Sequence, residues 1–166
     1  MPTEPYSNIP LETRAATLFK ADNLPSDHPR ADLIVFTAMT EAYGMAILSK
    51  QRFSSRCHSW HNEWFCYLRI ERSQDSPFDN VDDRYALEAC LHASLSKDGL
   101  GGVVSAGHGR EAVYIDFAAT DIAQAIARIE QELKEEPCAK GATLHLLDEG
   151  LQGMVFPVCP SAKTIN

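Results

Sequence analysis

The chain has 166 residues, of which 45% are hydrophobic and 23% are charged, and its formal net charge is -8. This is the composition of an ordinary globular domain with its own core, and it excludes wholesale disorder. The negative charge and the lack of an extended basic cluster argue against nucleic acid as a partner. No apolar run approaches the length of a membrane span, so we expect no membrane association.

The start of the chain and its cysteines indicate in which cellular compartment we expect the protein. Residues 1–5 read Met-Pro-Thr-Glu-Pro, without the basic start and apolar run of a signal peptide. The five cysteines are odd in number and contain no Cys-x-x-Cys pair. Reduced thiols are the usual state in a chain without a secretion signal. We therefore expect a soluble cytoplasmic protein of bacterial type.

The first third of the chain predicts two helices after a proline-containing lead-in. Residues 12–21 place apolar side chains on one side of a short helix, and residues 31–51 repeat them close to the 3.6-residue period. The second apolar stripe is wide, which indicates burial on more than one side. We therefore predict that residues 1–62 form a helical extension packed on the rest of the domain.

The segment from Glu63 to Glu71 predicts a strand, because its side chains alternate between two faces. One face would carry Trp64, Cys66, Leu68 and Ile70, and the other Phe65, Tyr67, Arg69 and Glu71. Both sets begin apolar, which is typical of a central strand that is covered on both faces.

A helix and a hairpin are predicted next. Asp79 or Asn80 can cap the N-terminus of the helix, and Gly99 is placed to end it. Residues 102–106 and 111–118 then read as two short strands joined by a turn.

The cleanest amphipathic segment of the chain follows the hairpin. Asp121, with Gln124 three residues later, resembles a capping box, and Pro137 would end the helix. Residues 143–147 read as the last strand, and residues 149–166 as an irregular tail.

From residue 63 to residue 148 the predicted order is therefore strand, helix, strand, strand, helix, strand. Right-handed crossovers fold this order into a four-stranded antiparallel sheet with both helices on one face. Phe65 and Tyr67 would lie on the other face, under the helices of residues 12–51 or under a second copy of the chain in a homodimer. The predicted fold class is α+β: one compact domain with a ferredoxin-like β-α-β-β-α-β core and an N-terminal helical extension.

A run of cysteines and histidines raises the question of a metal site. Cys57, His58, His61 and Cys66 are residue types that bind zinc. Zinc sites usually draw ligands from two separate knuckles, whereas these four lie in one run, and Cys66 alternates with core residues. The spacing favours a polar connection, and we predict no metal and no cofactor.

Other catalytic motifs are weaker still. The glycines between residues 99 and 109 match no phosphate-binding loop and suit a helix end and a hairpin. No cysteine and histidine form a known local signature, and adjacent acids such as Glu135 and Glu136 are usually solvated. We therefore predict no catalytic residue and favour a non-enzymatic role.

Four segments, at residues 99–109, 113–117, 121–133 and 141–145, carry a resemblance to a set of small bacterial domains. In these domains a helix runs into a glycine-rich hairpin, which an amphipathic helix and a closing strand follow. The resemblance spans residues 63–148. Some domains of this type are suspected immunity or accessory proteins of toxin systems, so it implies a cognate toxin as the partner and transfers no functional residue.

Small size, acidity and the resemblance favour a protein-binding module, specifically an immunity or antitoxin-type inhibitor whose acidic surface covers a basic active site. The candidate partner-binding residues are acids and one tryptophan, a residue type that is common at binding hot spots. They are Asp79, Asp82, Asp83, Asp148, Glu149 and Trp60. Two alternatives stay open: a small-ligand-binding regulatory domain, and a small hydrolase that pairs His58, His61 or His108 with a carboxylate.

Overall fold

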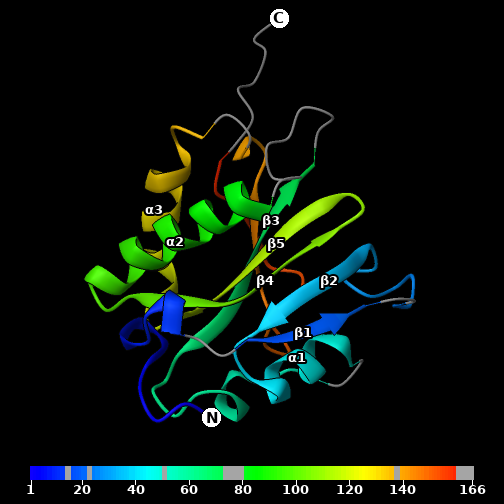
Figure 1. Cartoon of the computed structure of the whole chain (residues 1–166), viewed down its shortest axis with the longest axis horizontal. Coiled ribbons are helices and arrows are strands. Elements are labelled where there is room, and N and C mark those ends of the chain that lie inside the picture. Colours follow the sequence, from blue (N-terminus) through cyan, green and yellow to red (C-terminus); the bar gives the residue numbers. More distant parts are fainter. Residues whose placement is uncertain (14–15, 22–23, 50–51, 73–80, 137–138, 160–166) are drawn as a thin grey trace, which may run out of the picture.

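The computed structural model (Figure 1) shows an α+β protein built on one antiparallel sheet. The described residues are 1–13, 16–21, 24–49, 52–72, 81–136 and 139–159. Within them, seven strands lie in the order β1-β2-β4-β5-β3-β6-β7. The strands are β1 (Thr17–Lys20), β2 (Leu33–Ala38), β3 (Trp64–Glu71), β4 (Gly101–Gly109), β5 (Ala112–Ala119), β6 (Thr143–Leu146) and β7 (Val155–Pro157). The α-helices are α1 (Glu41–Leu48), α2 (Val81–Lys97) and α3 (Ile122–Leu133).

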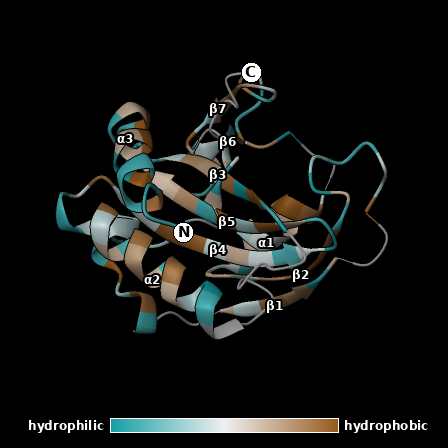
Figure 2. Ribbon diagram, turned by 90° about the horizontal axis from the view of Figure 1, so that it is seen from above, coloured by the Kyte–Doolittle hydropathy of each residue, from teal (hydrophilic) through white to brown (hydrophobic). Residues whose placement is uncertain are grey.

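The sheet separates two hydrophobic cores. Helices α2 and α3 cover one face, while α1 lies on the other face (Figure 2). The face under α1 is also covered by segments that precede and follow this helix, including the turn around Tyr6 and the residue Phe53. No helix in the described residues combines the length and apolar character needed to cross a membrane.

Strand β3 shows the predicted alternation, except that Trp64 at its start is 45% exposed and does not join the core with Cys66. Cys66, Leu68 and Ile70 are buried in the core under α2 and α3, while Phe65 and Tyr67 are buried in the opposite core. A fully buried side chain of this size stabilises the fold by roughly 1.5–3 kcal/mol. The predicted central strand is confirmed.

The predicted ends of two helices in the second half of the chain are also confirmed. Gly99 follows α2 with a φ of 65°, a left-handed conformation that glycine adopts without a Cβ clash. Asp121 caps α3 by accepting a hydrogen bond from the backbone N–H of Gln124, and the Gln124 side chain donates back to Asp121. The predicted caps at Asp79 and Asn80, and the predicted stop at Pro137, lie outside the described residues.

The prediction of a helical N-terminal extension was wrong. Residues 12–21 contain β1, and residues 31–51 contain β2 followed by the shorter helix α1. The run Leu33-Ile-Val-Phe-Thr-Ala contains three β-branched residues, which pack well in a strand. Helix α1 begins only after Thr40, whose side chain accepts a hydrogen bond from the backbone N–H of Tyr43. The wide apolar stripe in residues 31–51 therefore belongs to a strand that is followed by a helix.

The sheet is larger than the predicted four-stranded one. Strands β1 and β2 extend it beyond β4, and the ring of Phe19 on β1 stacks on Phe36 of β2 with centroids 5.0 Å apart. At the other end, β7 pairs with β6 in the segment predicted to be an irregular tail. Only the coarse α+β class is thus established for the whole chain.

Candidate functional site

A buried ion pair lies on the sheet face that α1 covers. The Nη1 atom of Arg30 donates to both carboxylate oxygens of Asp116, each 2.9 Å away. The Tyr43 hydroxyl donates to the same carboxylate at 2.7 Å. Arg30 is 2% exposed and Asp116 is 0% exposed, so these contacts replace solvation that both charges have lost.

His28 fixes the backbone that carries Arg30. Its Nδ1 accepts a hydrogen bond from the backbone N–H of Arg30, at 3.0 Å. Its Nε2 is 3.0 Å from the carbonyl oxygen of Ile47, so the neutral ring donates from Nε2. Ile47 lies in the last turn of α1, where helix carbonyls lack partners within the helix. The imidazole thus ties the turn before β2 to the C-terminal end of α1.

Tyr67 links the ion pair to a histidine on the next strand. In the sheet register Tyr67 of β3 lies opposite Asp116 of β5 and opposite His145 of β6. The guanidinium carbon of Arg30 is 4.0 Å from the Tyr67 ring centroid, a cation–π distance. The His145 ring is parallel to the Tyr67 ring, with centroids 4.6 Å apart.

Burial governs the titration of these groups. It raises the pKa of Asp116, while the charge of Arg30 and the hydrogen bonds from Tyr43 and Arg30 act in the opposite direction. Burial also raises the pKa of the Tyr43 hydroxyl well above its ordinary value. For His145, burial and the positive charges of Arg69 and Arg30 lower the pKa to about 4, so the ring is neutral at physiological pH.

A second carboxylate, Asp32, holds the hairpin between β4 and β5. It accepts hydrogen bonds from the Tyr114 hydroxyl and from the backbone N–H groups of Glu111 and Ala112. Partial burial raises the pKa of Asp32, but these three hydrogen bonds outweigh it, and the net pKa lies below its ordinary value. All of its known contacts hold the fold together, and we assign it a structural role.

A pocket of about 260 Å³ opens beside the ion pair. Its wall is formed by the turn that carries Arg30, by α1 and by the segment after β6, and it includes both charged and apolar side chains. These include Asp27, Arg30, Ile47, Phe53, Tyr67 and Leu147. The pocket is slightly smaller than the 300–1,000 Å³ typical of drug-sized ligands, which suits a small metabolite.

One donor of Arg30, a residue that lines this pocket, is unsatisfied. The Nη2 atom of Arg30 is buried and has no hydrogen-bond partner in the part of the chain that the structure describes. The faces of the Tyr67 and Tyr114 rings, at 4.0 and 5.5 Å from the guanidinium carbon, offset part of the cost. Buried donors are nearly always paired, so this atom requires an explanation.

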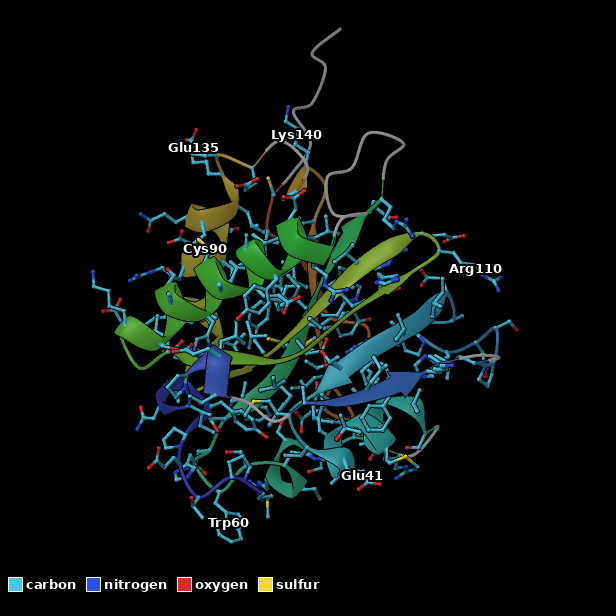
Figure 3. All side chains as sticks on the ribbon, in the orientation of Figure 1. Glu41, Trp60, Cys90, Arg110, Glu135 and Lys140 are labelled. Carbon is cyan, nitrogen blue, oxygen red and sulfur yellow. The ribbon has the colours of Figure 1, made fainter. Side chains whose placement is uncertain are left out.

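The predicted partner-binding residues do not share one environment. Trp60 is 67% exposed and points away from the body of the protein (Figure 3). Asp83 is exposed on α2. Asp148 instead accepts hydrogen bonds from the backbone and hydroxyl of Ser55. Glu149 forms an exposed ion pair with Arg52 at 2.8 Å. Asp79 and the side chain of Asp82 lie outside the described residues.

The cysteine and histidine run does not converge on one point. Cys66 is buried under α2 and α3, whereas His58 stacks on Phe53 in the opposite core, with centroids 4.8 Å apart. The Nε2 atom of His61 lies 3.2 Å from the carbonyl oxygen of Thr3. Among the described residues, no three His, Cys, Asp or Glu side chains are grouped to hold a metal ion.

The hydrolase alternative needs a histidine beside a carboxylate in a cleft. His108 on β4 is 3.0 Å from Nη1 of Arg84, a cation, through its Nδ1 atom. In the buried cluster, the carboxylate of Asp116 is occupied by Arg30 and Tyr43. Burial lowers the pKa of His58, and the nearby charge of Asp148 raises it in part, so His58, which lines another pocket, has a carboxylate near it.

Reasoning from the sequence missed His28, Arg30 and Asp116. One signal for Asp116 was present, because it is a charged residue in the middle of a strand between Ile115 and Phe117. Its partner is 86 residues away in the chain, and no local pattern connects the two.

The comparisons with known proteins add no relative. No protein-family model matches the chain, and neither a curated protein nor a solved structure matches it. The functional argument therefore depends on the geometry alone.

Proposed function

We propose that the protein is a non-enzymatic domain that binds a small polar metabolite in the pocket beside Arg30 and acts as a sensor or regulatory module. The observation that carries this proposal is the buried, unpaired Nη2 atom of Arg30, a residue that lines the pocket. An unpaired buried donor costs roughly 1–3 kcal/mol, and more when it is charged. A ligand acceptor that pairs with this atom would recover that free energy on binding.

Several contacts hold the residues that surround the pocket in place. His28 holds the turn of Arg30 against α1, and Phe53 packs against the rings of Tyr43 and Phe65. A preformed wall lowers the entropy cost of binding, because fewer groups must be ordered with the ligand.

A thermal-shift screen of metabolites tests the proposal, with the pocket filled in a variant. A ligand at 100 times its Kd stabilises the folded state by about 2.7 kcal/mol, and the Tm rises accordingly. Ala46 lies half-buried in the pocket wall, so Ala46→Trp should abolish the shift. The matched control is Ala86→Trp, at an exposed position on α2. A library without a stabilising compound, or an equal shift in Ala46→Trp, would contradict the proposal.

Protein binding remains a second candidate, favoured by the 67% exposure of Trp60. We propose that, if the chain is an immunity-type inhibitor, Trp60 anchors the toxin and Asp83 adds charge complementarity. Co-expression with a toxin encoded by a neighbouring gene tests this role. Protection of the host that is lost with Trp60→Ala would support it, and the absence of protection by the wild-type chain would oppose it.

We also propose two more detailed features of the chain, one of its fold and one of its location in the cell. Within the seven-stranded sheet, β4, β5, β3 and β6 are adjacent in that order and α2 and α3 share one face, which supports a ferredoxin-like unit over residues 64–146. The four cysteines that the structure describes are unpaired, which supports a cytoplasmic location.

A further inference from the structure

A second pocket lies next to the one beside Arg30. It has a volume of about 450 Å³ and shares three wall residues with the first pocket, namely Ala46, Ser49 and Phe53. We infer that the two pockets form one site for a linear acid with a terminal hydroxyl, whose carboxylate binds at Arg30 and whose hydroxyl binds at His58. The Arg30 end rests on the proposed metabolite-binding function, and the His58 end goes beyond it.

His58 is a buried polar side chain in the wall of the second pocket, where it is 8% exposed. Its ring stacks on Phe53 and meets the rings of Tyr43 and Phe65 edge-on. Within the described residues, neither of its ring nitrogens has a hydrogen-bond partner. Since buried polar groups are nearly always hydrogen-bonded, these nitrogens are candidates to pair with a ligand in the pocket.

The protonation state of His58 indicates which ligand group it would bind. Burial lowers its pKa, and the charge of Asp148 offsets this only in part, so the ring is neutral at pH 7. A neutral imidazole has one N–H donor and one acceptor nitrogen, and a hydroxyl, which both donates and accepts, pairs with either. Arg52, a charged residue of the same wall, forms an exposed ion pair with Glu149. A neutral hydroxyl therefore matches this end of the site better than a second charged group.

The carboxylate end is assigned by Arg30. A guanidinium has five N–H donors, and the contact with Asp116 uses only Nη1. Since Nη2 is shielded from solvent, a ligand carboxylate reaches it through a local shift of the side chains that cover it. Hydrogen bonds from a guanidinium to a carboxylate are stronger than those to a neutral acceptor, which favours an acid at this end.

Apolar side chains in the walls of the two pockets suit the middle of the ligand. Phe53 and the half-buried Ala46 line both pockets, and Ile47 lines the first. A methylene chain against these residues would be removed from water, and each buried methylene adds to the affinity. The ligand class is therefore a linear acid with a terminal hydroxyl.

Calorimetric titration with three compounds of one chain length tests the assignment: 8-hydroxyoctanoate, octanoate, which lacks the hydroxyl, and 1,8-octanediol, which lacks the carboxylate. The set is repeated with shorter and longer chains, because the span from Arg30 to His58 decides which length fits. At the matching length the hydroxy acid is expected to bind about three- to tenfold more tightly than either analogue. If no hydroxy acid binds more tightly than both of its analogues, the inference is wrong. If other metabolites raise the Tm while none of these acids binds, the inference fails and the proposed function stands.

The variant His58→Phe removes the ring nitrogens while an aromatic ring still packs against Phe53. In this variant the hydroxy acid should bind no more tightly than the simple acid, whose own affinity should stay within about twofold of its wild-type value. The matched control is His61→Phe, a change in the same run at a residue that is absent from the walls of both pockets, and it should retain the preference. A preference for the hydroxy acid that survives in His58→Phe would overturn the assignment of His58. The titrations of the wild-type chain test the inference independently of this variant.

Discussion

The two faces of the sheet are packed with different chemistry. Under α2 and α3 the core cluster is apolar, and residues such as Leu68, Leu91 and Ile129 are 0% exposed. Under α1 the core contains a buried ion pair between Arg30 and Asp116 among aromatic rings. The face under α2 and α3 depends mainly on shape and burial, although His92 of α2 is buried there and accepts a hydrogen bond from the backbone N–H of Val103. The face under α1 needs the donors of Arg30 and Tyr43 to meet the carboxylate of Asp116.

This difference suggests where function lies. A buried ion pair adds little net stability compared with apolar residues of the same volume, because both charges lose their hydration. The face under α1 keeps such a pair, with one donor unpaired, beside a pocket. The helix-covered face is best understood as the scaffold, and the face under α1 as the site.

The largest expected effect comes from breaking the ion pair. Arg30→Met leaves the carboxylate of Asp116 buried without its cation and should reduce the free energy of unfolding by about 3–5 kcal/mol in urea titrations. The double variant Arg30→Met/Asp116→Leu removes both charges and should recover most of this loss. A double variant as unstable as the single one would contradict our view that the pair is not required for stability.

On the face under α2 and α3, the corresponding prediction concerns the loss of packing in the core. Leu68→Ala should cost about 2–5 kcal/mol, because Leu68 is fully buried between the sheet and the helices. Here no second substitution in a partner should rescue the loss, since no charge is left unpaired. A cost below about 1 kcal/mol would mean that this face is loosely packed.

The pH dependence of stability should come largely from the polar face. The folded-state pKa of His145 is about 4 and its ordinary value is 6.5, so the unfolded chain binds the extra proton between these values. The free energy of unfolding should therefore fall as the pH falls from about 6.5 to 4, by about 1–2 kcal/mol for this partly exposed ring. His145→Phe keeps an aromatic ring against Tyr67 and should flatten this part of the profile. If the profile of His145→Phe matches that of the wild type, the pH dependence comes from other groups. One such group is His58, because burial lowers its pKa as well.

The smallest expected effect is at the start of α3, on the scaffold side. Asp121→Ala removes the side chain that accepts from the backbone N–H of Gln124 and should cost about 1 kcal/mol. Asp121→Asn retains an acceptor and serves as the control. Equal stability of the two variants would show that the cap contributes nothing measurable.

The contrast between the two faces of the sheet also explains which features could be predicted from the sequence. The scaffold side depends on local signals: alternation in β3, Asp121 as a cap and Gly99 as a helix end. The site side is assembled from segments far apart in the chain, such as Arg30 with Asp116. In residues 31–51 a strand and a helix follow each other with apolar residues throughout, and periodicity alone does not separate them. The pocket wall also depends on where the turn of His28 meets α1, which is a tertiary contact without a sequence signature.

The most direct test of the site is a measurement on Arg30 itself. Side-chain N–H signals of Arg30 can be followed by NMR in protein labelled with nitrogen-15 arginine while the strongest stabilising metabolite is added. A new hydrogen bond to Nη2 should shift the Arg30 guanidinium signals and slow their exchange with solvent. Much smaller changes are expected at Arg128, a half-buried arginine on α3 that pairs with Asp98. Unchanged Arg30 signals at saturation with the ligand would contradict the assignment of the pocket beside Arg30 as the binding site.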